Sequence, residues 1–180
     1  MTIVALSLFV TFFALASGKA LGQSVSDSSS ATRDWVISET TSPVDYSPVV
    51  IATTRSRDSV EGSAMELSIS CRSGHTNLAV TGRTISGRGD DYAISYRIND
   101  KEPVQLGAGS RSFGAGVAFQ GDIVRLLQSF PDQGEVAIRL VPRTGSAREG
   151  FFSLNGLAAV RTRLAVACRW PPATAKPGNQ

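Results

Sequence analysis

The two cysteines of this chain constrain its fold more than any other feature of the sequence. Cys71 lies in the stretch MELSISCRSG, and Cys168 follows 97 residues later, close to the C-terminus. In an exported chain a pair of cysteines usually forms a disulfide, and two cysteines allow a single connectivity. The sequence therefore predicts a Cys71–Cys168 disulfide, which in the chain-entropy model contributes roughly 4–5 kcal/mol for a loop of this length.

Two other uses of the cysteines fit the sequence less well. A structural zinc site needs four ligands at characteristic spacings, whereas the chain has two cysteines and a single histidine, His75. A redox site needs a C-x-x-C motif or a reactive thiol beside a resolving partner, and the sequence shows neither pattern. We therefore expect no metal and no cofactor.

The N-terminal residues predict export. Residues 3–16 are apolar, small residues follow, and Ala20-Leu21-Gly22 fits a cleavage site, which is the pattern of a secretory signal peptide. A membrane anchor is the competing interpretation, but the apolar stretch is shorter than the ~20 residues that cross a bilayer. We expect residues 1–22 to be a signal peptide and the protein to be periplasmic or secreted, without stable membrane insertion after cleavage.

Composition divides the rest of the chain into a linker, a single domain and a tail. Residues 23–33 are rich in serine and predict a flexible linker, and residues 171–180 are rich in proline and predict a disordered tail. Residues 34–170 have the size of a single domain, which we expect to be rich in β-strands. The formal net charge is +3, and acidic residues are interspersed among the arginines, so we do not expect nucleic acid as a partner.

Alternating hydrophobicity predicts a mainly β (α+β) domain. In AMELSISCR every second residue is apolar, so Cys71 should point into the core from a half-buried strand that turns at SGH into a second strand. YAISYRIND and GEVAIRLVP alternate similarly, whereas RSFGAGVAF fits either a bulged strand or a loop. We predict an antiparallel β-sandwich or partial barrel of about seven strands, with a short helix and a C-terminal helix packed on it.

Apolar residues at helical spacing predict the two helices. In GDIVRLLQSF one apolar face repeats behind Asp122, which suits a helix N-terminus. In NGLAAVRTRLAVACRW we expect Asn155 to be the N-cap of a helix whose apolar stripe ends at Cys168, with Arg161 and Arg163 on the polar side. The two apolar faces comprise Ile123, Leu126, Leu127 and Phe130 in the first helix, and Leu157, Val160, Leu164 and Cys168 in the second.

Few residues in the sequence suggest a catalytic role. His75 lies in a turn, Asp90 and Asp91 follow a glycine-rich turn, and Asp100 and Glu102 form another acidic pair. A serine hydrolase would need His75 as its base together with a G-x-S-x-G motif, which the sequence lacks. A glycosidase would need two carboxylates that face each other across a cleft. Solvated turn residues are the simpler interpretation, and we assign no catalytic residue.

The turn GRGDD also contains Arg88-Gly89-Asp90, a tripeptide that integrins read in some extracellular ligands. A position on an exposed turn would suit that role. The tripeptide is common by chance, however, and turns favour glycine and aspartate for conformational reasons. We therefore interpret it as part of a turn.

Motifs spread over residues 35–170 resemble a known family when they are taken in order. They are DWVIS, ELSISCRSGHTNLAV, ISYRINDKEP, FQGDIVRLLQS, VAIRLVPRTG and FFSLNGLAAVRTRLAVACRW. Together they resemble the VasI/TagO-like proteins, which are small periplasmic proteins associated with type VI secretion clusters. The residues that match the family's Y-R motif and closing helix are Tyr96, Arg97, Phe152, Leu154, Gly156, Leu157, Cys168 and Trp170. The resemblance implies an accessory protein and supplies no catalytic residue.

These observations predict an exported, non-enzymatic accessory protein of the bacterial envelope that acts through contacts with a protein partner. One alternative is a small periplasmic cell-wall hydrolase with His75, Asp90 or Asp91 in its site. Another is an inhibitor of, or binding module for, such a hydrolase. A pocket that joins His75 to a carboxylate would favour the enzyme, a protruding loop would favour the inhibitor, and an exposed apolar patch would favour the accessory protein.

Overall fold

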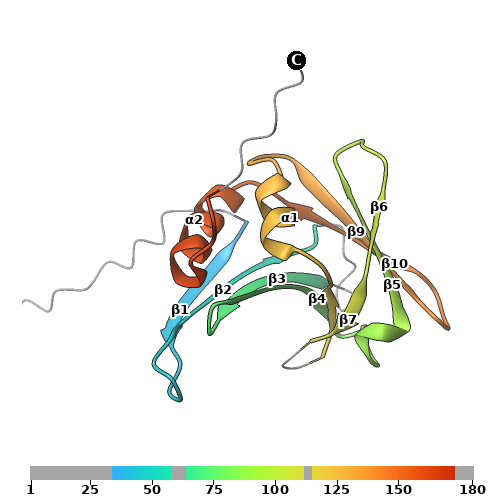
Figure 1. Cartoon of the computed structure of the whole chain (residues 1–180). Helices are drawn as coiled ribbons and strands as arrows, with labels where there is room; N and C mark the ends of the chain where they lie inside the picture. Colours follow the sequence, from blue (N-terminus) through green and yellow to red (C-terminus); the bar gives the residue numbers. More distant parts are fainter. Residues whose placement is uncertain (1–33, 58–63, 112–114, 173–180) are drawn as a thin grey trace, which may run out of the picture.

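The computed structural model describes residues 34–57, 64–111 and 115–172, which form two antiparallel β-sheets and two α-helices (Figure 1). The predicted mainly β class, with a short helix and a C-terminal helix, is therefore confirmed. The predicted signal peptide, the linker and residues 173–180 of the predicted tail lie outside the described residues.

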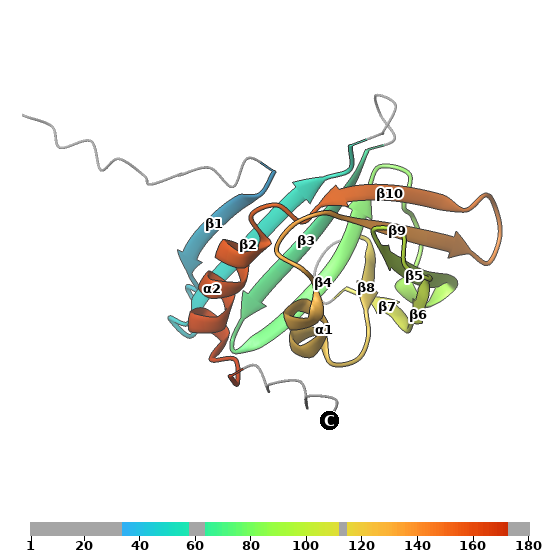
Figure 2. The same ribbon diagram turned by 90° about the horizontal axis from the view of Figure 1, so that it is seen from above.

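The larger sheet has six strands in the order β1-β2-β3-β4-β8-β7, and the smaller has four in the order β10-β9-β5-β6 (Figure 2). The larger sheet comprises β1 (Val36–Thr41), β2 (Pro48–Arg55), β3 (Met65–Arg72), β4 (His75–Gly82), β7 (Ala108–Ser110) and β8 (Val117–Phe119). The smaller comprises β5 (Tyr92–Ile98), β6 (Val104–Leu106), β9 (Glu135–Pro142) and β10 (Arg148–Ser153). The described strands do not close into a barrel.

The described strands number ten, whereas the sequence predicted about seven. The difference comes from β6, β7 and β8, which have three residues each. A strand of this length is too short to show a pattern of alternation, and β6 and β7 are separated only by Gly107. The RSFGAGVAF segment, which fitted either a strand or a loop, contributes β8.

The core lies between the two sheets and beneath the helices. The apolar face predicted for β3 is confirmed, because Met65, Leu67, Ile69 and Cys71 are all buried, although Ser68 on the opposite face is buried too. Figure 1 shows both helices on the same face of the larger sheet, where α2 (Leu157–Cys168) contacts β2, β3 and β4 and α1 (Ile123–Ser129) contacts β4. The apolar stripes predicted for both helices face this core.

The predicted disulfide is confirmed. Cys71 and Cys168 are bonded, with their Cα atoms 5.7 Å apart, and both are buried. Cys71 lies opposite Val50 of β2 and Thr76 of β4, so the bond joins an interior strand of the larger sheet to the last turn of α2. It thereby fixes the C-terminal helix on the core.

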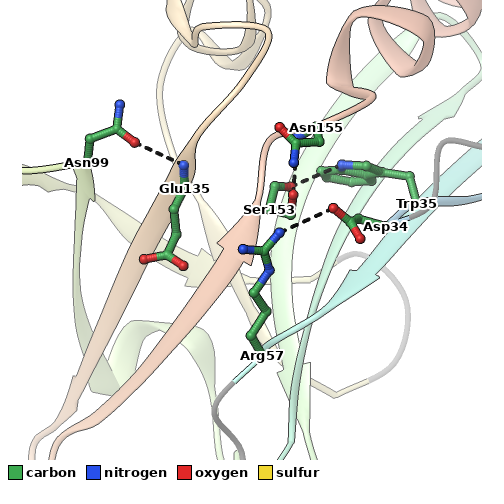
Figure 3. Close-up of polar contacts among 7 residues, drawn as sticks. All are labelled: Asp34, Trp35, Arg57, Asn99, Glu135, Ser153 and Asn155. Carbon is green, nitrogen blue, oxygen red and sulfur yellow. Dashed lines mark hydrogen bonds and ion pairs between the residues drawn. The ribbon is translucent and has the colours of Figure 1, made fainter.

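The predicted N-cap of α2 is wrong by one residue. The N-cap is Gly156, whose φ of 92° is left-handed and suits glycine, and the side chain of Asn155 makes no capping hydrogen bond. The backbone N–H of Asn155 instead donates to Ser153 Oγ at 3.2 Å (Figure 3). The chain needs the left-handed glycine to turn from β10 into the helix, and this turn displaces the helix start beyond Asn155.

The side chain of Arg161 also departs from the prediction, because it is not on the solvent side of α2. Only 18% of it is exposed. It donates hydrogen bonds to the backbone carbonyls of Leu127 at 3.0 Å and Phe130 at 2.7 Å, and it pairs with Asp132. These carbonyls end α1 without helical partners, and Arg161 satisfies them from the neighbouring helix. Burial lowers the pKa of the Arg161 guanidinium.

The start of the described chain is hydrogen-bonded to the end of β10. The indole N–H of Trp35 donates to the carbonyl of Ser153 at 3.2 Å, and the indole itself is buried in the core (Figure 3). Asp34 beside it forms an ion pair with Arg57 at 3.3 Å. The N-terminal strand is therefore fixed to β10 immediately before α2 begins.

Candidate protein-contact surface

The residues that sequence reasoning considered for catalysis lie far apart. His75 is the exposed first residue of β4, opposite Arg72. Asp90 and Asp91 belong to the short 3-10 helix η1 (Gly89–Asp91), and Asp91 forms an ion pair with Arg143 at 3.8 Å. Nothing in the described contacts joins the histidine to either carboxylate.

The strand register shows how far His75 lies from the Asp90–Asp91 pair. Gly89 packs on Gly109 of β7, which pairs with Ala118 of β8, which in turn pairs with Ala79 of β4. Ala79 is about 13 Å along β4 from His75, and β7 is about 10 Å across the sheet from β4. The structure therefore does not bring His75 and the Asp90–Asp91 pair together for shared acid–base chemistry.

The Arg88-Gly89-Asp90 tripeptide has a packing role. Gly89 is buried, and a Cβ atom built on it would lie 1.7 Å from the carbonyl oxygen of Gly109. Its N–H donates to Ser110 Oγ at 3.1 Å. Close backbone contact with β7 thus requires the glycine, a reason that the interpretation of the tripeptide as part of an exposed turn did not include.

Asp100 and Glu102 are exposed on the turn between β5 and β6, where they border a hollow on the smaller sheet. Across the residues that the structure describes, no group of three or more His, Cys, Asp and Glu side chains is arranged to hold a metal ion.

A different feature stands out on the surface, namely the tip of the hairpin between β1 and β2. This hairpin tip comprises residues Ser42–Ser47 and carries Val44 and Tyr46, which are 89% and 82% exposed. These are the highest exposed fractions among the large hydrophobic side chains that the structure describes. We therefore take the hairpin tip as the candidate protein-contact surface, since contiguous exposed apolar side chains mark such surfaces.

Hydrogen bonds hold the hairpin tip in one conformation. Asp45 Oδ1 accepts from the backbone N–H of Ser47 at 3.2 Å and from its hydroxyl at 2.8 Å. The Tyr46 N–H donates to the Ser42 carbonyl at 2.9 Å, and Tyr46 itself has a φ of 54°, which is uncommon for a residue with a side chain. The two apolar side chains are therefore presented by an ordered turn.

The Asp45 carboxylate also joins the hairpin tip to the next turn. Its Oδ2 accepts from the hydroxyl of Ser73 at 2.9 Å, in the turn between β3 and β4. Hydrogen bonds from the Ser42 side chain, then from Ser47 and Ser73, hold the pKa of the Asp45 carboxyl well below its usual range. The carboxylate is thus charged and bonded at any ordinary pH.

The hairpin tip belongs to the same end of the molecule as the disulfide. Ser73 follows Cys71 by two residues, and Thr76 on β4 accepts a hydrogen bond from the Trp170 indole at 2.7 Å, just beyond α2. Glu39 of β1 forms an ion pair with Arg163 of α2 at 2.9 Å. The surface that displays Val44 and Tyr46 therefore rests on the covalently fixed part of the fold.

Sequence reasoning missed the hairpin tip. The segment SPVDYSP carried one usable signal, because Asp-x-Ser between two prolines favours a turn in which the aspartate bonds to the backbone two residues later. The contact with Ser73 had no signal, since the two residues are 28 positions apart.

No family model, no curated protein and no solved structure matches this chain. The fold and the surface nevertheless define a class, which is a mainly β protein whose C-terminal helix is fixed by a disulfide. That disulfide indicates an oxidising environment outside the cytoplasm. In the part of the chain that the structure describes, no helix has the length and apolar character needed to cross a membrane.

Proposed function

We propose that this protein is an exported accessory protein of the bacterial envelope that works by binding a protein partner through its hairpin tip. The observation that carries the proposal is the pair of exposed side chains, Val44 and Tyr46, on a turn ordered by Asp45. Tyrosine is enriched in interface hot spots, and an ordered loop loses little conformational entropy on binding.

The compartment proposed is the periplasm. The disulfide supports an oxidising compartment, and the apolar N-terminal residues support export through a signal peptide. The resemblance to the VasI/TagO-like proteins supports an association with type VI secretion. In this proposal the partner is a protein of the secretion apparatus with an apolar pocket for the hairpin tip.

A second candidate function rests on the same protruding loop. An inhibitor of a cell-wall hydrolase would insert Val44 and Tyr46 into the groove of its target, and a bulky exposed pair on a rigid turn suits that task. Addition of the purified protein to a muramidase acting on cell-wall material tests this candidate. Dose-dependent inhibition that Tyr46→Ser removes would favour the inhibitor over the secretion accessory.

Complementation in the bacterium that encodes the protein tests the main proposal. A strain without the gene should lose type VI secretion, measured as release of the secreted tube protein, and the wild-type gene should restore it. The double variant Val44→Ser/Tyr46→Ser should not restore secretion. The triple variant His75→Ala/Asp90→Asn/Asp91→Asn should restore it fully.

Val104→Ser serves as the matched control, because Val104 is an exposed apolar residue of β6, an edge strand of the smaller sheet, whereas the hairpin tip belongs to the larger sheet. It should behave as the wild type does. Failure of the triple variant in a folded protein would revive the hydrolase, and full activity of the hairpin-tip variant would overturn the proposal.

A further inference from the structure

The outer face of the smaller sheet carries a hollow of about 380 Å³, here called the outer hollow. It forms where four residues of β5 and β9 make a square, since Ser95 lies opposite Arg139 and Arg97 lies opposite Ala137. Directly paired residues point to the same face, so the two small side chains occupy one diagonal and the two arginines the other. The small residues leave the space that the arginines border.

The floor of the outer hollow is shielded from solvent. Ser95 and Ala137 are 7% and 5% exposed, although they point away from the inter-sheet core. The long side chains around them cover them, including Glu149 of β10, which lies opposite Arg139. The site is therefore a recess with a small polar floor, and its volume falls at the lower end of the ~300–1,000 Å³ range of small-ligand sites.

Among the described residues, neither arginine of the outer hollow forms an ion pair, although Glu149 lies opposite Arg139 on the neighbouring strand. Arg57, Arg143, Arg161 and Arg163 form ion pairs, whereas neither Arg97 nor Arg139 does so. Two guanidinium groups directed to one recess can each offer paired N–H donors to a carboxylate. They provide the charge and the geometry for an anionic group.

The remaining charged side chains at the outer hollow indicate which charges its ligand should carry. Asp100, Glu102 and Glu149 border it together with Lys101, so three acidic side chains balance the three basic ones. A ligand that is only anionic, such as a phosphate ester, would meet repulsion from the carboxylates. A ligand with both a carboxylate and an ammonium group matches both signs of charge.

We propose that the outer hollow binds a short peptide with free ends, whose carboxylate lies between Arg97 and Arg139 and whose ammonium group meets the acidic side chains. The site is on the opposite sheet from the hairpin tip and is independent of the protein contact proposed there. The Ser95 hydroxyl adds a hydrogen-bonding group at the floor.

Titration of the full exported protein with trialanine, followed by ¹H–¹⁵N NMR, tests this proposal. The amide signals of Ser95, Arg97, Ala137 and Arg139 should shift saturably with millimolar peptide. Acetylation of the peptide's amino group or amidation of its carboxylate should each weaken binding about tenfold, the effect of losing one charged hydrogen-bonded pair. Inorganic phosphate should bind more weakly than the free peptide.

Variants separate the site from the rest of the surface. Arg97→Gln and Arg139→Gln should each weaken binding about tenfold, and Ala137→Met should abolish it by filling the recess. Arg125→Gln, which removes an exposed arginine of α1, should leave the affinity unchanged. Unchanged spectra elsewhere confirm that each variant is folded.

Three results would overturn the proposal. They are the absence of a saturable shift in the wild-type protein, equal affinity of the Arg97→Gln/Arg139→Gln double variant, and phosphate binding as tight as that of trialanine. The last would identify the outer hollow as a site for simple anions.

Discussion

The carboxylate of Asp45 accepts a hydrogen bond from the hydroxyl of Ser73 at 2.9 Å and so joins the β1–β2 hairpin tip to the turn between β3 and β4. Ser73 lies two residues after Cys71, which is bonded to Cys168 of α2. One aspartate thereby connects the exposed pair Val44 and Tyr46 to the part of the fold that the disulfide holds. The bonds of Asp45 to Ser47 order the proposed contact surface, and the bond to Ser73 joins this surface to the fixed part of the fold.

The first prediction concerns the protonation of Asp45. Because its folded pKa is depressed, the carboxylate contributes order above the ordinary aspartate pKa of about 3.9, and this contribution is lost only as the pH falls through the lower folded value. The carboxyl carbon of Asp45 should therefore show no transition near pH 4 in an NMR titration, and the hairpin tip should stay ordered there.

The variant Asp45→Asn keeps the size of the side chain but removes its charge. It should increase fast backbone motion of Val44 and Tyr46, measured by ¹⁵N relaxation, without changing the core. Ser73→Ala should do the same to a smaller degree, because Asp45 keeps its bonds to Ser47. An ordinary titration midpoint for Asp45 in the wild-type protein would contradict this account of the hairpin tip.

The second prediction concerns the disulfide. The double variant Cys71→Ala/Cys168→Ala should lower the free energy of unfolding by about 4 kcal/mol, since the bond closes a long loop and both residues are buried. Chemical denaturation of the oxidised wild-type protein and of the variant gives the difference. A loss below about 1 kcal/mol would show that the bond adds little to the packing of α2.

The third prediction concerns Arg161. Arg161→Met should destabilise the protein by about 2–3 kcal/mol, because it leaves two partly buried carbonyl groups at the end of α1 without their charged donor. Arg161→Lys should recover only part of this loss, since an ammonium group lacks the planar fork that reaches both oxygens.

Arg163→Met on the same helix is the control for Arg161. Its side chain is 56% exposed and forms a surface ion pair with Glu39, so its loss should cost less than about 1 kcal/mol. Equal effects of the two substitutions in thermal or chemical unfolding would argue against a structural role for Arg161.

The fourth prediction separates packing from recognition at the Arg88-Gly89-Asp90 tripeptide. Gly89→Ala should destabilise the protein by about 1–3 kcal/mol, because its methyl group would overlap the backbone of Gly109. Asp90→Ala, in the same exposed turn, should leave stability within about 0.5 kcal/mol of the wild type. Tolerance of alanine at position 89 would contradict the close packing of η1 on β7.

The class of the fold could be predicted because apolar residues alternate along β3, β5 and β9. The alternation through Cys71 and the apolar stripe that ends at Cys168 together predicted which elements the disulfide joins, and the structure confirms both. The three-residue strands β6, β7 and β8 could not be predicted, since their pairing depends on neighbours distant in the sequence.

The hairpin tip and the outer hollow could not be predicted for the same reason, because both depend on residues that are distant in the sequence. The hairpin tip is joined to the turn between β3 and β4 by the contact of Asp45 with Ser73, and the outer hollow exists because Ser95 and Arg97 are in register with Arg139 and Ala137. Neither relationship is local in sequence. Arg161 was placed on the wrong side of its helix for the same reason, because its partners belong to α1.

Photo-crosslinking in the living bacterial envelope tests the central claim most directly. A benzophenone side chain in place of Tyr46 is compared with one in place of Val104, which is exposed on the edge strand β6 of the other sheet. The account predicts a discrete protein adduct from position 46 that weakens when Val44→Ser is added, and no adduct from position 104. No adduct from position 46, or the same adducts from both positions, would contradict it.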